Sequence, residues 1–187
     1  EKLAVVMQEK NGDYRAADGG PLDGKALVDQ YLSYAEKLRP LVTDTTSLVN
    51  GALKQGRSVL FEGAQGTMLD IDYGTYPFVT SSNATAGGAC TGLGVPPTSI
   101  TGVAGVSKAY TTRVGSGPFP SEMPDVEATE LRKRGNEYGA VTGRPRRCGW
   151  LDLAVLRYAI MLNGITSLVV TKLDVFDTQR EIQVCVG

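Results

Sequence analysis

Residues 171–174 (TKLD) carry side chains that could recognise a purine base. They directly follow the apolar run 168–170, so Asp174 is expected at the mouth of a buried strand. A carboxylate there can accept hydrogen bonds from N1–H and the 2-amino group of guanine, and adenine offers no such pair of donors in that geometry. Leaving a buried carboxylate unpaired costs about 1–3 kcal/mol, which discriminates between bases. The stem of Lys172 can lie against the base. Since four residues match easily by chance, a plain strand-end turn is the alternative.

The arginine-rich sequence VTGRPRRCGW could bind an anion. The guanidinium groups of Arg144, Arg146 and Arg147 suit a carboxylate or a phosphate. The preceding Thr-Gly pair can present backbone N–H groups, and Pro145 stiffens the loop. A solvated basic loop is the alternative. The three basic residues at positions 132–134 read as an exposed helix face.

Residues 59–88 combine an apolar start with a loop rich in Gly, Thr, Ser and Asn. The order predicts a strand at 59–62 followed by a ligand loop, because open α/β sheets bind ligands at the carboxyl ends of their strands. The amide of Gln65 could read a purine edge or stabilise a developing oxyanion, although an ordinary turn residue is the alternative. Asp70 and Asp72 could bind a cation, which we consider the weaker interpretation.

The composition excludes several kinds of site. The 187 residues contain no histidine, so neither a Ser-His-Asp or Cys-His arrangement nor a histidine metal site can be built from them. Three separated cysteines predict neither a disulfide framework nor a zinc site, and a reducing cytoplasm is expected. The net charge of −1 argues against wholesale binding of nucleic acid or membranes. No apolar run approaches the length of a membrane span.

Residues 19–25 (GGPLDGK) match the GxxxxGK pattern of a phosphate-binding loop. The context argues against that function, because the preceding residues are polar and Ala26 stands where Ser or Thr would hold magnesium. We predict a turn followed by a helix that Asp23 caps.

Helix and strand patterns alternate along the chain. Helices are expected from Asp23 to the stop at Pro40, from Asp44 through Leu53, and over residues 126–134 and 152–163, the last ending at Gly164. Strands are expected at residues 59–62, 102–113, 168–170 and 181–186. This alternation predicts an α/β fold with a largely parallel sheet flanked by helices.

Four blocks of this sequence resemble the adenylosuccinate synthetase family in order and spacing: FEGAQGTMLDIDYGTYPFVTSSNATAGG, KAYTTRVGSGPFPSE, GNEYGAVTGRPRRCGWLDL and TKLDV. The similarity covers nearly the whole chain, and the first and third blocks are highly specific. The resemblance implies a P-loop-NTPase-like α/β fold and a cytoplasmic, homodimeric ligase that joins IMP to L-aspartate, using GTP and Mg²⁺. In that family GTP phosphorylates the 6-oxygen of IMP, and the aspartate amine then displaces the phosphate.

The resemblance also assigns residues to three ligands. The positions that correspond to IMP contacts are Gln65, Leu69, Thr80, Val114, Gly115 and Arg144, with Gln65 as the catalytic residue beside the hypoxanthine ring. The aspartate loop corresponds to Ala140, Val141, Thr142, Gly143, Arg144, Pro145 and Arg146. The GTP contacts correspond to Arg146 at the phosphates and to Lys172, Leu173 and Asp174 at guanine. No metal ligand is expected in this segment.

The chain also departs from the family pattern. The family's glycine-rich phosphate loop, with its aspartate base and histidine acid, has no counterpart here, Tyr73 replaces a common histidine, and Pro145 replaces a frequent basic residue. We therefore expect residues 1–187 to be the central segment of a single longer domain, incomplete at both ends and inactive alone, with the Mg²⁺ ligands in the missing N-terminal part. A guanine-nucleotide-binding regulatory or interaction module without synthetase activity is the alternative, and a purely structural α/β fragment is a third.

Overall fold

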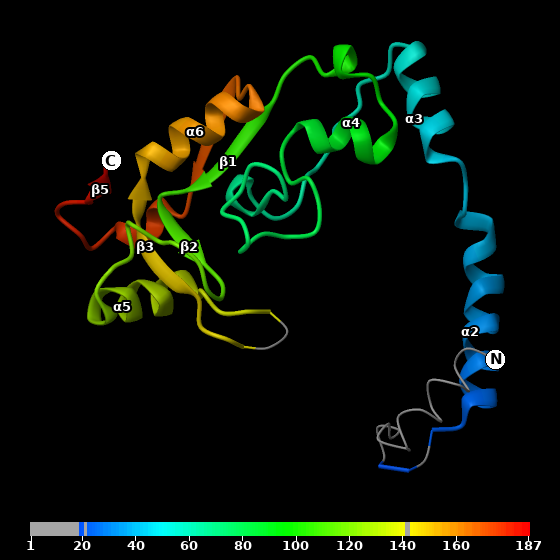
Figure 1. The fold of residues 1–187 in the computed structure, drawn as a ribbon, viewed down its shortest axis with the longest axis horizontal. Helices are drawn as coiled ribbons and strands as arrows, with labels where there is room; N and C mark the ends of the chain where they lie inside the picture. Colours follow the sequence, from blue (N-terminus) through cyan, green and yellow to red (C-terminus); the bar gives the residue numbers. More distant parts are fainter. Residues whose placement is uncertain (1–18, 21, 141–142) are drawn as a thin grey trace. The chain divides into compact units, whose positions relative to one another are not determined.

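The structure of the chain is a computed structural model that describes residues 19–20, 22–140 and 143–187 (Figure 1). The chain divides into two compact units, Glu1–Thr45 and Thr46–Gly187. All of the predicted ligand residues, from Gln65 to Asp174, belong to the second unit.

The described part of the first unit contains the helix α2 (Gly24–Leu38) and the 3-10 helix η1 (Arg39–Leu41). The side chain of Asp23 accepts hydrogen bonds from the backbone N–H groups of Lys25 at 2.9 Å and Ala26 at 3.0 Å, so the predicted cap is confirmed. The last two residues of the GxxxxGK pattern form the first turn of this helix. Pro40 stands in η1 directly after the helix, as predicted.

The second unit alternates helices and strands, and the α/β class is confirmed. The helix α3 (Thr45–Lys54) leads into it, and its elements then follow in the order η2 (Thr67–Leu69), α4 (Gly87–Leu93), η3 (Pro97–Ser99), β1 (Ala104–Lys108), β2 (Tyr110–Arg113), α5 (Asp125–Gly135), β3 (Arg147–Asp152), α6 (Leu153–Asn163), β4 (Ser167–Thr171), η4 (Leu173–Phe176) and β5 (Val184–Cys185). The helix α6 begins after its cap Asp152 and ends at Gly164 in the left-handed conformation (φ 60°), as expected.

The strands form two small sheets. In the first, β1 pairs with β4 in parallel, so the carboxyl end of β1 at Lys108 lies opposite Thr171. In the second, β3 pairs with β2 in antiparallel fashion and with β5 in parallel. The TKLD motif therefore begins at the shared carboxyl edge of β1 and β4, which is where open α/β sheets present ligand groups.

Several strand predictions need correction. Residues 59–62 form no strand, because no described segment pairs with their backbone, and Leu60 is 93% exposed. The expected strand over 102–113 is two strands in different sheets, separated at Ala109. The predicted strand at 181–186 shrinks to β5. The strand β3 was not predicted, because its arginine-rich start reads as a loop until β2 pairs with it.

The buried core lies between the β2–β3 ladder, α5 and η4. It consists of Ala109, Tyr110, Met123, Ala128, Leu131, Cys148, Val175 and Phe176, with Trp150 packed against it. The Tyr110 and Trp150 rings both contact Phe176, edge-on at 5.8 Å and stacked at 6.4 Å between ring centroids. These contacts fix η4, which carries Leu173 and Asp174, against the second sheet.

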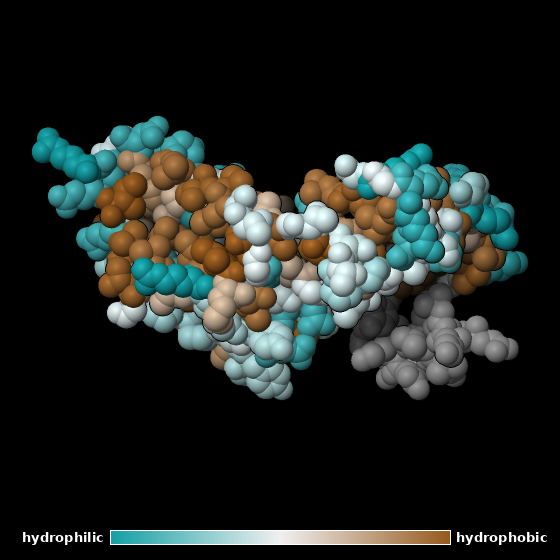
Figure 2. All heavy atoms as spheres, turned by 90° about the horizontal axis from the view of Figure 1, so that it is seen from above, coloured by the Kyte–Doolittle hydropathy of each residue, from teal (hydrophilic) through white to brown (hydrophobic). Residues whose placement is uncertain are grey.

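Large apolar side chains also remain exposed on the second unit, including Val106, Met161 and Leu60. Figure 2 shows apolar side chains over much of the face in view. Exposed apolar area of this kind marks contact surfaces for other protein segments or partners. Among the described helices, none is both long and apolar enough to cross a bilayer.

Candidate functional site

Both ends of the loop between η2 and α4 are hydrogen-bonded to the last residue of α6. Asn163, the last residue of α6, donates a hydrogen bond to Thr67 Oγ1 at 3.0 Å and accepts one from the Ala86 N–H at 2.8 Å. Within the loop the Thr80 N–H donates to the Leu69 carbonyl at 2.7 Å. The structure therefore brings Leu69 and Thr80, two of the predicted IMP residues, side by side.

Arg113, at the end of β2, joins this loop to the turn that follows β2. Its Nη2 donates to Thr75 Oγ1 at 2.9 Å and to the Phe78 carbonyl at 3.1 Å. The next two residues are Val114 and Gly115, which begin the turn. Arg113 Nε also donates to the Ser116 carbonyl at 3.0 Å, so Arg113 ties this turn to the loop that carries Leu69 and Thr80.

Arg147 fixes the same turn from the neighbouring strand β3. It forms a bidentate ion pair with Glu122 at 2.7 and 2.5 Å, and it donates to the carbonyls of Gly115 at 3.3 Å and Gly117 at 3.0 Å. The hydrogen bonds from Arg147 hold the pKa of the Glu122 carboxyl below its usual range. Arg113 and Arg147 are cross-strand partners. The β2–β3 ladder therefore connects this turn to the arginine loop, residues 140–146, which directly precedes β3.

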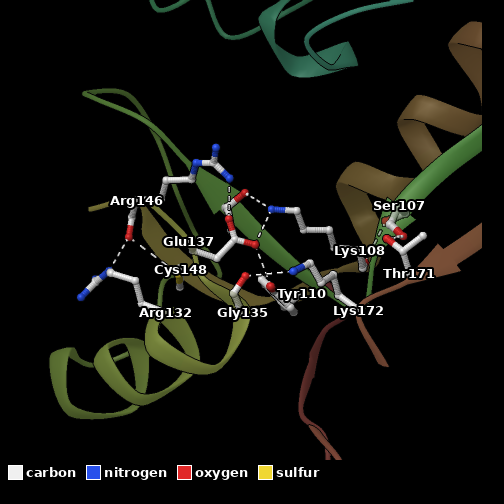
Figure 3. Close-up of polar contacts among 11 residues, drawn as sticks. Ser107, Lys108, Tyr110, Arg132, Gly135, Glu137, Arg146, Cys148, Thr171 and Lys172 are labelled. Atoms are coloured by element: carbon white, nitrogen blue, oxygen red, sulfur yellow. Dashed lines mark hydrogen bonds and ion pairs between the residues drawn. The ribbon is translucent and has the colours of Figure 1, made fainter. Parts of the chain in front are cut away.

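Glu137 is a buried carboxylate that binds the end of the arginine loop through Arg146 (Figure 3). Its Oε1 accepts hydrogen bonds from Lys108 Nζ at 2.6 Å and Tyr110 Oη at 2.7 Å, and its Oε2 accepts one from Arg146 Nη1 at 2.6 Å. Burial by itself raises the pKa of the Glu137 carboxyl, but these hydrogen bonds outweigh it and leave the pKa below the usual value. Burial and the bond to Glu137 raise the pKa of Tyr110 well above its ordinary value. Glu137 is therefore a charged acceptor.

The predicted arginine loop is closed by its own backbone. The Gly139 N–H donates to the Arg144 carbonyl at 2.9 Å, and the Gly143 N–H donates to the Gly139 carbonyl at 2.8 Å. Val141 and Thr142 lie outside the described residues. The described residues of the loop that face solvent are Ala140, Gly143, Arg144 and Pro145. The loop is thus open to a ligand on its outer side and anchored at Arg146 on its inner side.

The TKLD motif lies against the end of α5. Lys172 Nζ donates to the Gly135 carbonyl at 2.9 Å, which places the ammonium group two residues from Glu137 along the chain. Leu173 and Asp174 are exposed on η4, at the mouth of β4 as predicted. The structure thus brings the arginine loop and the TKLD motif to the same turn after α5.

Two of the predicted ligand residues have an uncommon backbone conformation. Among the described non-glycine residues, positive φ angles occur at Gln65 (63°), Asn136 (52°) and Lys172 (62°). Asn136 is the cap at the end of α5, where this conformation is ordinary. At the other two positions it costs on the order of 1 kcal/mol or more, and such strain collects at functional sites. Gln65 and Lys172 therefore share a backbone conformation of the kind that is common at functional sites.

Sequence reasoning missed the residues that support the site. Glu137 sits in the block GNEYGAV, where nothing local distinguishes it from a surface glutamate, and Arg113 ends a strand whose partners lie far along the chain. The available signal was indirect: Glu137 stands between the basic residues 132–134 and the arginines that begin at Arg144, a setting that suggests an ion pair.

Asp70 and Asp72 do not act together. The Asp70 carboxylate is fully buried and accepts hydrogen bonds from the N–H groups of Asp72 and Tyr73 at 3.0 Å and of Thr85 at 3.1 Å. The Asp72 side chain is exposed and accepts from Asn83 at 2.7 Å. Asp70 therefore shapes the loop rather than binding a cation. In the described part of the chain, no three His, Cys, Asp or Glu side chains gather into a group that could hold a metal ion.

Comparison with protein families gives one match that spans the chain. The sequence model of the family named adenylosuccinate synthetase matches residues 1–187. The adenylosuccinate synthetase of Solibacter usitatus is 63% identical over 187 residues, which are 100% of this chain and 43% of that protein. That of Thermodesulfovibrio yellowstonii is 60% identical over 166 residues, which are 89% of this chain and 39% of that protein. The chain thus spans less than half the length of these relatives.

The fold also occurs in solved structures, among them those of two synthetases. The fully ligated adenylosuccinate synthetase of Plasmodium falciparum superimposes with a TM-score of 0.86 at 41% identity, covering 98% of this chain and 42% of that one. The succinoaminodeoxyadenylate synthetase of cyanophage S-2L, bound to dGMP and to dATP as an energy donor, gives a TM-score of 0.61 at 27% identity. The matched region covers 81% of this chain and 45% of the cyanophage chain.

Replacing Asp70 by Asn in the complete protein is expected to lower the free energy of unfolding by about 1–3 kcal/mol. The amide cannot accept from all the N–H groups that the carboxylate binds, and its own NH₂ group would face a buried donor. Urea denaturation measures the loss. The matched control is Asp72→Asn, whose exposed side chain should matter by less than about 0.5 kcal/mol.

The stability difference between wild type and Asp70→Asn should depend on pH. Burial raises the pKa of Asp70, but the hydrogen bonds from Tyr73, Asp72 and Thr85 outweigh it and keep the pKa below its usual value. The carboxylate's contribution is therefore complete above the unfolded-state pKa of about 3.9 and is lost as the pH falls through the lower folded-state pKa. A difference that increased on acidification would contradict this.

Proposed function

The chain belongs to the adenylosuccinate synthetase family, and on that premise we propose that the complete protein joins IMP to L-aspartate with hydrolysis of GTP. The products are adenylosuccinate, GDP and phosphate, which is the first step from IMP towards AMP in purine nucleotide synthesis. The γ-phosphoryl group of GTP passes to the 6-oxygen of IMP, and the aspartate amine then displaces phosphate from C6. The observation that carries the proposal is the family match over all of residues 1–187.

We assign the IMP side of the site to the loop after η2 and the turn after β2. The contact residues are Gln65, Leu69, Thr80, Val114 and Gly115, joined by Arg144 from the arginine loop. The hydrogen bond between Leu69 and Thr80 and the bridge from Arg113 support a single surface. Gln65 is the catalytic residue, because its amide can donate to negative charge that develops on the hypoxanthine ring.

We assign L-aspartate to the loop of residues 140–146. The exposed Arg144 suits a substrate carboxylate, and backbone N–H groups of a glycine-containing turn can bind the same group. The members of this loop are Ala140, Val141, Thr142, Gly143, Arg144, Pro145 and Arg146. We also assign Arg146 to the GTP phosphates, because its Nη1 is held by Glu137 while its side chain stays 31% exposed.

We assign guanine recognition to Lys172, Leu173 and Asp174. Asp174 accepts from N1–H and the 2-amino group, and the exposed carboxylate becomes desolvated when the base covers it. The cyanophage relative is bound to dATP as its energy donor, so the donor base differs within proteins of this fold. The preference of this chain for guanine is therefore a property that must be tested at Asp174.

We also propose that the complete enzyme requires Mg²⁺, which neutralises charge on the phosphates during transfer. Since no group of metal ligands occurs among the described residues, we assign none of them to the ion. The complete protein is further proposed to be a cytoplasmic homodimer. Residues 1–187 would form the central segment of its single α/β domain, and the exposed apolar side chains around β1 and α6 support contact with further protein.

Activity and binding measurements on the complete protein test this function. We expect adenylosuccinate to form only when IMP, GTP and L-aspartate are all present, and calorimetry should detect binding of both IMP and GTP. Binding of guanine nucleotides without any response to IMP would instead support a regulatory module. No binding of any of the three would leave a structural role and would refute the proposal.

In the complete enzyme, Asp174→Asn should weaken the use of GTP and favour xanthosine triphosphate, whose 2-oxygen can accept from the new amide. The expected loss of kcat/KM with GTP is about tenfold or more, as for a buried acceptor left mismatched. Steady-state kinetics with GTP, XTP and ATP measure the preference. The matched control is Asp177→Asn, since Asp177 is exposed directly after η4. An unchanged order of the three nucleotides would refute the guanine assignment.

The 187-residue chain by itself should make no adenylosuccinate, because it contains no histidine to serve as the family's general acid. A coupled assay with purified chain, all substrates and Mg²⁺ measures this, with the complete enzyme as positive control. Product formation that persists after removal of any full-length enzyme would contradict the expectation.

A further inference from the structure

Glu137 is the most buried charged side chain near the arginine loop, and no assignment above gives it a role in the reaction. Only 2% of its side chain is exposed, whereas its cationic partners Lys108 and Arg146 are 29% and 31% exposed. The carboxylate is therefore covered, whereas both of its cationic partners remain partly exposed.

Glu137 binds Arg146 through both its side chain and its backbone. Its Oε2 accepts from Arg146 Nη1 at 2.6 Å, and its carbonyl accepts from the Arg146 N–H at 3.0 Å. Arg132 completes the support, because its Nε donates to the Arg146 carbonyl at 2.8 Å. The position of Arg146 is consequently set by groups that themselves lie inside the protein.

The other carboxylate oxygen connects this arginine to the strands. Lys108 ends β1 and Tyr110 begins β2, and both donate to Oε1 (Figure 3). The Tyr110 ring is buried and packs edge-on against Phe176, so the hydroxyl has little freedom to move. A Cβ atom added at Gly135 would clash with this hydroxyl, and the Gly135 carbonyl is the acceptor for Lys172. The turn after α5 therefore holds both cations that are proposed to bind GTP: Gly135 accepts from Lys172, and Glu137 accepts from Arg146.

We infer that Glu137 is a positioning residue that holds the Arg146 guanidinium in place for the GTP phosphates and for the aspartate loop. This inference rests on the proposed function, because that proposal supplies the ligands of Arg146. Glu137 itself touches no substrate. It acts by fixing Nη1 of the guanidinium in a side chain that stays 31% exposed and can bind an anion.

The carboxylate is required because it is a pure acceptor with two oxygens. Glutamine has the same size, but its NH₂ group would face the donor of either Arg146 or Lys108, so one contact is lost. Aspartate keeps the charge but is one methylene shorter, by about 1.5 Å, and cannot reach all three donors.

Steady-state kinetics of the complete enzyme test the inference with Glu137→Gln. The KM values for GTP and L-aspartate should rise about tenfold or more, since a charge-assisted hydrogen bond is lost, while the KM for IMP should change less than about twofold. The matched control is Glu130→Gln, on the exposed face of α5, which should leave all three values unchanged. A purely structural role would lower the melting temperature and kcat without separating the substrates in this way.

A double-mutant cycle identifies the residue through which Glu137 acts. In an Arg146→Gln background, Glu137→Gln should change the KM for GTP by less than about twofold, because its target is already absent. An undiminished effect in that background, or wild-type constants in the single variant, would overturn the inference.

If the Glu137→Gln variant does not fold, the Tyr110→Phe variant tests the inference instead. This change keeps the ring packing and the buried charge but removes one donor to Oε1, so the KM for GTP should rise about threefold or more and that for IMP should not. An unchanged KM for GTP would overturn the inference. An inactive wild-type enzyme would overturn the proposed function and this inference together, whereas an active wild type with insensitive variants would overturn this inference alone.

Discussion

A carboxylate buried among cations is the constraint on which the arrangement of this site depends. Glu137 must remain paired, because an isolated buried charge costs far more than any single contact contributes. Its partners come from the end of β1, the start of β2 and the arginine loop. Pairing them therefore fixes the arginine loop against the β1–β2 junction, which lies 27 to 29 positions before Glu137 in the sequence. The loop gains a rigid inner side while its outer side stays open to ligands.

The same logic extends along the β2–β3 ladder to the other half of the site. Arg113 and Arg147 are cross-strand partners that both donate to backbone carbonyls of the turn after β2. Arg113 also donates to the Phe78 carbonyl in the loop before α4. Guanidinium groups suit this task because their donors diverge in a fixed plane. The site is thus built from loops whose conformation is set by arginine side chains, with the strands acting as the rigid connection between them.

Local signals predicted the helices α2, α3, α5 and α6 but not α4, and non-local pairing limited the prediction of the strands. The caps Asp23 and Gly164 are readable because they act within a turn or two, and α2 and α6 end where predicted. By contrast, residues 59–62 form no strand and residues 147–152 do, because a strand exists only where another segment pairs with it. The proposed ligand residues came from motifs and from the family resemblance, whereas Glu137 was missed, since its burial depends on partners 9 to 29 positions away.

A crystal structure of the complete enzyme with IMP, L-aspartate and a non-hydrolysable GTP analogue tests the central claim most directly. The account predicts that Arg146 still donates to Glu137 at about 3 Å while its other edge contacts a phosphate oxygen. It also predicts the Asp174 carboxylate within hydrogen-bonding distance of guanine N1 and its 2-amino group. An Arg146 side chain that leaves Glu137 when the ligands bind would contradict the account, as would a guanine base recognised elsewhere.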